Sequence, residues 1–252
     1  MPILSFYAAG LFLRSLIILR GFRCHMLKKY AWFYSYVFAA LLADAVLSST
    51  WAISPHWYRA AYWTAQFITL VFGCGLIFEI FKHVLSPYPG AEMFARATLF
   101  LTLVLIFLSV LVYDRFIRVS LSASYVELER DVRTAQVVFL VAVFFVILHY
   151  AIPLGRNMRG MMYGYALYVG ASLLTLAFRA YAGLGFDALW RFLQPFSSCL
   201  TLCIWLFALW AYSPSPVPSA QITLEADYEA LVTATKGGVS VLRSYLGRSV
   251  RN

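Results

Sequence analysis

The sequence VELERDVRTAQVVFLVAVFFVILHY, residues 126–150, passes from a charged half to an apolar half and decides the class of fold. Its first part carries five charged side chains within seven residues: Glu127, Glu129, Arg130, Asp131 and Arg133. Residues 134–150 contain no Asp, Glu, Lys or Arg. A helix needs about 20 predominantly apolar residues, with a lower limit near 17, to cross a bilayer. The stretch therefore predicts a helix that begins in water and enters a membrane.

The composition of the whole chain agrees with a membrane protein. Of the 252 residues, 62% are hydrophobic and 12% are charged, and the mean hydropathy is +0.77. A soluble domain carries roughly 25% charged residues. At about 20 residues per span, about six to eight helices would use nearly the whole chain. This leaves no room for a soluble catalytic domain.

Apolar runs separated by loops with charged, Pro or Gly residues predict seven spans. They cover residues 2–19, 30–53, 60–81, 97–113, 134–152, 160–182 and 188–212. We expect the fifth span to begin as a helix outside the membrane, because Glu129 and Arg133 are spaced i, i+4 as in a helical ion pair. The predicted fold is an all-α, seven-helix transmembrane bundle over residues 1–212.

The distribution of Lys and Arg predicts the orientation, because positively charged loops stay in the cytoplasm. Twelve lie on the side of the C-terminal tail: Arg20, Arg23, Lys28, Lys29, Lys82, Arg96, Arg156, Arg159, Lys236, Arg243, Arg248 and Arg251. Seven lie on the other side: Arg59, Arg115, Arg118, Arg130, Arg133, Arg179 and Arg191. The N-terminus is therefore expected outside and the C-terminus in the cytoplasm.

Residues 213–219 and 220–252 are expected to lie outside the bundle as a linker and a cytoplasmic amphipathic tail. The linker SPSPVPS has alternating prolines, which favour an extended chain. In the tail, Leu224, Tyr228 and Leu231 follow helical spacing, but Gly237 and the glycine after it interrupt it. A helix that docks on the inner leaflet or on a protein partner and a partly ordered tail both remain open.

Polar residues inside the predicted spans form two sets. A charge at mid-helix costs about 2.5–3.5 kcal/mol on insertion scales, so each needs a partner or a function. The outer set consists of Asp44, Gln66, Gln136 and Arg179. The inner set consists of Arg14, Glu79 and His149. We expect the outer set to line an outward-facing pocket with aromatic walls that include Tyr62 and Trp63.

Most of these residues also have a structural interpretation. Arg14 and Glu79 can form an ion pair, and Arg179 lies close enough to a membrane face to extend into water. For these three we favour structure over function, and His149 more often hydrogen-bonds a neighbour than binds a ligand. Asp44 lies nine residues before the end of its span at Ile53 and must be protonated, paired or hydrated. Function and structure stay open for Asp44.

The sequence disfavours several cofactors and reactions. Retinal needs a lysine in the middle of the last helix, which residues 188–212 lack. Transmembrane haem needs two histidines at one depth, and only His149 falls inside a span. Motifs of metalloproteases, serine hydrolases and P-loop enzymes are missing. We expect no catalytic residue and no metal site, and the cofactor stays unknown. Nucleic acid is not expected, because the basic residues lie in short loops where lipid head groups bind them.

Gly160 and Gly164, followed by Gly170, predict a small-residue face on the sixth span. We favour packing within the bundle over a dimer seam for this face.

Several short segments carry a resemblance to a known group of proteins: Glu79, the turn at Pro87–Pro89, Leu128-Glu129-Arg130, Arg133 and Gln136. They resemble bacterial seven-helix integral membrane proteins that have no established activity. The resemblance covers most of residues 1–212 and implies a multi-pass protein, with the bacterial inner membrane as the expected location.

These observations favour a non-catalytic protein that senses or binds a ligand or partner through the outer pocket, with the tail as a docking segment. A structural or accessory subunit of a larger membrane complex is the alternative, in which the polar residues fix helix packing. A transporter or membrane enzyme that uses Asp44 is a weaker alternative.

Overall fold

The computed structural model describes residues 2–53, 55–86, 88–117, 121–182 and 187–213, and the single positions Pro216, Ala226, Glu229, Ala230, Val232, Thr233 and Thr235. Within these residues the chain forms seven α-helices and no strand. They are α1 (Pro2–Arg23), α2 (Ala31–Ile53), α3 (Pro55–Leu85), α4 (Pro89–Ile117), α5 (Leu121–His149), α6 (Arg156–Ala182) and α7 (Asp187–Ala208). The all-α prediction is confirmed.

The helix α5 runs without a break from the charged half of its sequence into the apolar half. Its i, i+4 pair is formed, with Arg133 Nη2 at 2.9 Å from Glu129 Oε1. The helix ends at His149, where Ala151 takes a left-handed conformation with φ 46° and the amide of Ile152 donates to the carbonyl of Ile147 at 3.1 Å. This arrangement closes the last turn of a helix. The prediction of one continuous fifth helix is confirmed.

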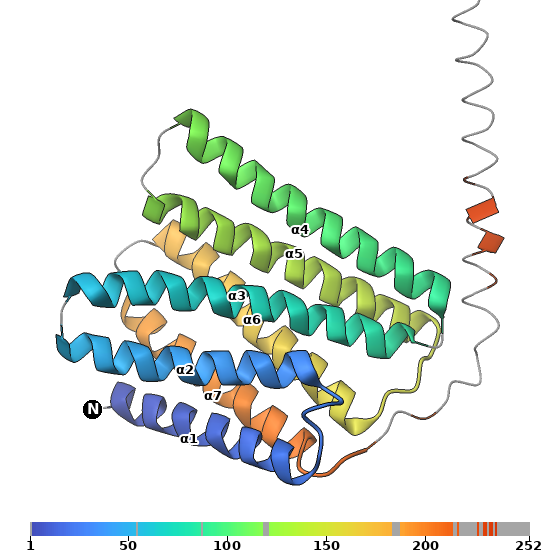
Figure 1. Cartoon of the computed structure of the whole chain (residues 1–252), viewed down its shortest axis with the longest axis horizontal. Helices are drawn as coiled ribbons and strands as arrows, with labels where there is room; N and C mark the ends of the chain where they lie inside the picture. Colours follow the sequence, from blue (N-terminus) through green and yellow to red (C-terminus); the bar gives the residue numbers. More distant parts are fainter. Residues whose placement is uncertain are drawn as a thin grey trace, which may run out of the picture.

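The helices α1, α2, α3, α5 and α4 lie side by side in that order, and α6 and α7 pack behind them (Figure 1). α7 contacts α1 and α6, while α6 contacts α5 and α3. α4 packs on α3 and α5 at the edge of the bundle. α3 is the most central helix, because it contacts α2, α4, α5 and α6.

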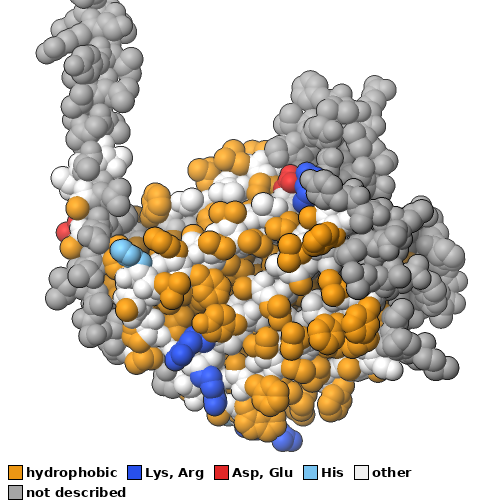
Figure 2. Space-filling view, turned by 180° about the vertical axis from the view of Figure 1, so that it is seen from behind, with side chains coloured by type: hydrophobic (Ala, Val, Ile, Leu, Met, Phe, Trp, Pro, Cys, Tyr) orange, Lys and Arg blue, Asp and Glu red, His pale blue; other side chains and the backbone are white. Residues whose placement is uncertain are grey.

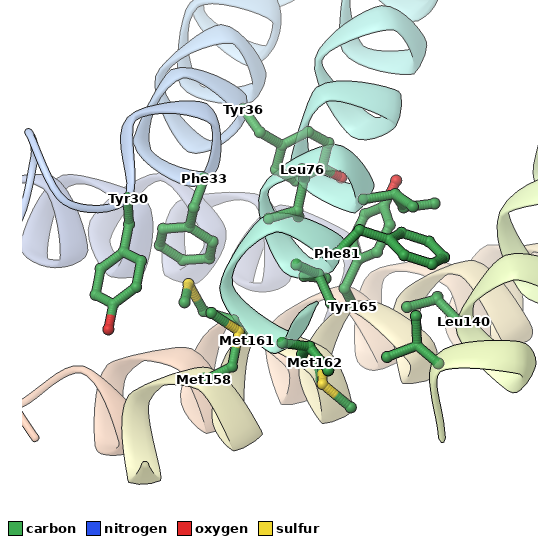
Figure 3. Packing of buried hydrophobic residues seen from close by; sticks show 14 of the residues in the cluster. Tyr30, Phe33, Tyr36, Leu76, Phe81, Leu140, Met158, Met161, Met162 and Tyr165 are labelled. Carbon is green, nitrogen blue, oxygen red and sulfur yellow. The ribbon is translucent and has the colours of Figure 1, made fainter. Parts of the chain in front are cut away.

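The core of the bundle is filled by aromatic, aliphatic and sulfur-containing side chains (Figure 3). Leu76, Ile77 and Ile80 of α3 are completely buried. Met158 and Met161 of α6 pack against them in the same cluster. Methionine fills irregular gaps between helices because its side chain is unbranched and flexible.

The outer surface of the bundle is also apolar. Figure 2 shows one face covered mostly by hydrophobic side chains, with few charged ones. Met93, Leu148 and Phe207 are among the large apolar side chains that are exposed. Soluble proteins rarely expose contiguous apolar patches larger than a few hundred Å². Among the described residues, five helices, α1 to α5, are long and apolar enough to cross a membrane, so the fold is compatible with a multi-pass membrane protein.

Two glycines allow α6 and α7 to pack closely. A methyl group at Gly160 would overlap the side chain of Ala208, and one at Gly164 would overlap Trp205. The close approach also lets Trp205 Nε1 donate to the carbonyl of Met161 at 3.3 Å. Packing within the bundle is therefore confirmed for these two glycines. Gly170 is not part of this contact, because a methyl group there would meet nothing within 4 Å.

The segment after α7 is held against the start of α6. Asn157 is fully buried, and its Nδ2 donates to the carbonyl of Ala211 at 3.1 Å. Its Oδ1 accepts from the amide of Ser213 at 2.5 Å, and Arg20 Nε donates to the carbonyl of Trp210 at 2.8 Å. These bonds fix the position of residues 210–213 against α1 and α6.

The predicted linker 213–219 and tail 220–252 lie mostly outside the described residues. The tail positions that are described, from Ala226 to Thr235, are helical. Thr233 Oγ1 donates to the carbonyl of Glu229 at 2.8 Å, as in a helix. The amphipathic tail stays a prediction.

We expect Gly160→Ala to lower the free energy of unfolding by about 1–3 kcal/mol, because the added methyl group overpacks the α6–α7 contact. Gly170→Ala is the matched control on the same helix. It should be neutral or raise stability by up to about 1 kcal/mol, because alanine favours a helix over glycine. Thermal unfolding in detergent, followed by tryptophan fluorescence, measures both. Equal effects of the two substitutions would contradict the assigned contact.

Candidate functional site

A cavity of about 240 Å³ lies between α1, α2, α3, α6 and α7. This volume is far above the roughly 10–15 Å³ that a cavity needs to hold one water molecule. On α2 the cavity runs from Tyr36 to Leu47, which is about 16 Å at 1.5 Å per residue. We call it the Arg14–Asp44 cavity after the two charged side chains in its wall.

The walls are built from helix faces that carry small or polar residues. α2 contributes Tyr36, Ala40, Ala43, Asp44 and Leu47, and α3 contributes Tyr58, Tyr62, Ala65, Gln66 and Thr69. α7 contributes Gln194, Pro195, Ser198, Cys199, Thr201, Leu202 and Trp205. α1 contributes Phe6, Tyr7, Gly10 and Arg14, and α6 contributes Tyr168. Because residues three or four apart share one face of a helix, this spacing turns each set toward the same space.

The cavity is hollow where the wall residues are small. Gly10, Ala40, Ala43 and Ala65 occupy wall positions on three different helices. Larger apolar residues at these positions would fill the space with side chains, as in the rest of the core.

Asp44 is paired with Arg14, whose Nη1 donates to Asp44 Oδ2. The two side chains are 15% and 23% exposed, so each is partly open to the cavity. Of the three states predicted for Asp44 (protonated, paired or hydrated), the structure shows the paired one. It joins α1 to α2 near the middle of both helices.

The predicted partner of Arg14 was wrong. We expected Arg14 near the inner face with Glu79, counting its depth from Arg20. α1 continues to Arg23, which places Arg14 three residues deeper, or about 4.5 Å along the helix. At this depth Arg14 lies within reach of Asp44 on the antiparallel α2.

Glu79 binds the start of α2 instead. Its side chain is buried, with Oε2 accepting from the amide of Phe33 at 2.8 Å and Oε1 from the amide of Trp32 at 3.2 Å. The first amides of a helix have no partner within the helix, and a negative charge is favourable there. Glu79 of α3 therefore caps α2, and the preference for a structural role is supported.

His149 also lies apart from the predicted inner set. It is exposed at the end of α5 and stacks on Phe145 with ring centroids 5.8 Å apart. Arg14, Glu79 and His149 thus contact three different groups, and the inner cluster is corrected to three separate sites.

The predicted outer set is only partly brought together. Asp44 and Gln66 line the cavity, where Gln66 Nε2 donates to Tyr62 Oη at 3.2 Å. Gln136 is buried behind the cavity wall, with its Nε2 3.4 Å from Cys74 Sγ. Arg179 lies in the last turn of α6, and its side chain is outside the described residues.

Gln136 belongs to a second buried group, which we call the Arg133 cluster: Tyr36, Arg133, Gln136, Tyr165 and Tyr168. The guanidinium of Arg133 lies 5.3 Å from the ring centroid of Tyr168, and its side chain is 6% exposed. Arg133 belongs to the part of the fifth helix that we expected outside the membrane, and its side chain is buried between the helices, beside the cavity wall. Tyr36 and Tyr168 line both the cavity and the cluster, so they form the wall between them.

Several cavity residues were not predicted, among them Tyr7, Tyr58, Tyr168, Gln194 and Trp205. The signal that could have found many of them is the spacing itself. Small or polar residues recur at i, i+4, i+7 and i+8 in α2 and α3, and at i, i+4 and i+7 in α7.

Comparison with known proteins adds no relative: no protein-family model, no curated protein and no solved structure matches the chain.

We expect Glu79→Leu to lower the free energy of unfolding by about 1–3 kcal/mol, because the buried amide of Phe33 and the partly buried amide of Trp32 lose their acceptor. Glu79→Gln should fall between the parent and the leucine variant, since one amide oxygen remains. Glu92→Gln is the control, because Glu92 pairs with the exposed Arg96 on the surface at 3.1 Å and such pairs contribute at most about 1 kcal/mol. Chemical unfolding in detergent measures the three values. A loss at Glu92 as large as that at Glu79 would contradict the capping role.

We expect Asp44→Leu to destabilise the protein by about 3 kcal/mol, because it leaves Arg14 without its partner in low-dielectric surroundings. Arg14→Met should do the same to Asp44. The double variant, with both substitutions, should recover most of the parent's stability, because replacing both ions by apolar residues is often neutral. A double-mutant cycle from thermal unfolding measures the coupling. Additive losses would contradict the ion pair.

Proposed function

We propose that the protein is a multi-pass membrane protein that binds a small molecule in the Arg14–Asp44 cavity and senses its presence, without catalysing a reaction. The observation that carries this proposal is a polar and aromatic cavity with a partly exposed ion pair in its wall. Ligand sites are typically concave, with many apolar contacts and a few placed polar groups. The cavity has this character.

For the topology we propose seven spans, with the N-terminus outside and the C-terminus in the cytoplasm of the bacterial inner membrane. Lys and Arg residues at the ends of α1 and α3, just before the start of α2, and near the starts of α4 and α6 support this orientation. The opposite end of the bundle holds the starts of α1, α3 and α7, where Tyr7, Tyr58 and Gln194 line the cavity. The cavity then opens outward.

Binding is a better explanation than transport because aromatic side chains close the inner end of the cavity. Trp205 is almost fully buried and packs edge-to-face on Tyr36, with centroids 6.0 Å apart. Phe33 also packs edge-to-face on Trp205, with ring centroids 5.0 Å apart. A solute would have to move these three rings to pass through the bundle.

The tail from residue 220 is proposed to dock on the inner leaflet or on a protein partner. Its support is the hydrogen bonding of Asn157 to the segment before it, which holds the exit of the chain at the proposed cytoplasmic end. A role as an accessory subunit of a larger complex would use the same tail as its interface.

Thiol labelling tests whether the cavity opens outward. Cys199 lines the cavity, whereas Cys203 lies one turn along α7 and does not. In right-side-out vesicles, a variant that keeps only Cys199 should react with a membrane-impermeant methanethiosulfonate reagent. The matched variant that keeps only Cys203 should react much more slowly, and a variant with its only cysteine at Lys28→Cys should react only after permeabilisation. A Cys199 that reacts only from the inside would contradict the proposed orientation of the cavity.

A further inference from the structure

We infer that the Arg14–Asp44 cavity takes a small zwitterion, a molecule with one acidic and one basic group close together on an apolar or aromatic body, such as a free α-amino acid. This inference rests on the proposed function and names the class of ligand for the same cavity.

The charged wall offers a donor and an acceptor side by side. Arg14 uses Nη1, and Asp44 uses Oδ2, in the bond between them. A guanidinium has five N–H donors, and a carboxylate has two acceptor oxygens. The Nε and Nη2 groups of Arg14 and Oδ1 of Asp44 can therefore bind a ligand while the ion pair stays intact. Both side chains are partly exposed, which gives a ligand access to them.

The opposite charges of Arg14 and Asp44 disfavour ligands that carry only one sign of charge. Among the described residues that line the cavity, Arg14 and Asp44 are the charged ones. A purely anionic ligand at Arg14 would lie beside the negative Asp44, and a purely cationic ligand at Asp44 would lie beside the positive Arg14. A zwitterion presents the opposite sign to both residues. Its own charges are then compensated on leaving water, which a single buried ion would not achieve.

The remaining walls suit an apolar or aromatic body. Tyr58 and Tyr62 stack with ring centroids 6.4 Å apart near the outer end, and Tyr36 and Trp205 meet edge-to-face at the inner end. Aromatic rings favour offset or edge-on contacts with other rings and also bind aliphatic groups. The volume of about 240 Å³ limits the ligand to a small molecule.

The test uses the full-length protein in lipid nanodiscs and three matched probes: L-phenylalanine, 2-phenylethylamine and 3-phenylpropanoate. L-Leucine is added as a zwitterion without a ring. Thermal stabilisation and calorimetry should show binding of L-phenylalanine. The amine and the acid, which each lack one charge, should bind at least about tenfold more weakly than L-phenylalanine, since a lost charged hydrogen bond has this effect.

Two double variants supply the matched comparison. Arg14→Met with Asp44→Leu should remove amino-acid binding. Arg96→Met with Glu92→Leu removes the surface ion pair of α4 and should leave binding unchanged. Thermal unfolding of each variant shows that it is folded before binding is measured.

Several outcomes would overturn the inference. They are an amine or an acid that binds as tightly as L-phenylalanine, no binding of L-phenylalanine, or unchanged binding in a folded Arg14→Met, Asp44→Leu variant. A further measurement separates failure of the zwitterion inference from failure of the proposed function. It is mass spectrometry of the small molecules released from the purified parent and from a cavity-filling Ala43→Phe variant. If the parent alone releases a molecule that is not a zwitterion, the inferred class of ligand is wrong, but the cavity is still a binding site. No released molecule, together with an unreactive Cys199, would overturn both.

Discussion

In the part of the bundle that the structure describes, each buried charge has its partner on another helix or one turn away on its own helix. Arg14 of α1 pairs with Asp44 of α2, and Glu79 of α3 caps the start of α2. An unpaired charge is costly in apolar surroundings, so these contacts restrict how the helices can slide. α2 is held at its start by α3 and near its middle by α1. The walls of the cavity depend on this fixed register.

The sequence predicted the class of fold because hydrophobic runs and charged loops are local signals. It predicted the Glu129–Arg133 pair for the same reason, since both residues lie on one helix. It failed for Glu79, because the partner of Glu79 is a set of backbone amides that no side-chain pattern reveals. The predicted position of Arg14 was wrong because its depth in the membrane was counted from Arg20, whereas α1 ends at Arg23.

The cavity was predicted only through Asp44, Gln66 and its aromatic wall at Tyr62. The recurrence of small and polar residues along α2, α3 and α7 contains more information than the charges alone. Even so, the spacing of residues along a helix identifies which face of that helix is special, but not which other helix packs against that face. That α7 closes the bundle against α1 depends on packing between the two ends of the chain, and in part on the close approach of α6 and α7 at Gly160.

The fifth helix, whose sequence first indicated a membrane, reaches the cavity through one side chain of α6. Tyr168 lines the cavity and lies under the guanidinium of Arg133 at 5.3 Å. A buried guanidinium resists the loss of its partners, so displacement of Tyr168 by an occupant of the cavity would act on α5. Because α5 is unbroken from Leu121 to His149, such a displacement can move the helix as a unit. Among the described residues, the exposed His149 contacts the rings of Phe145 and Tyr150, so coupling by α5 has to depend on movement of the whole helix rather than on a chain of polar contacts.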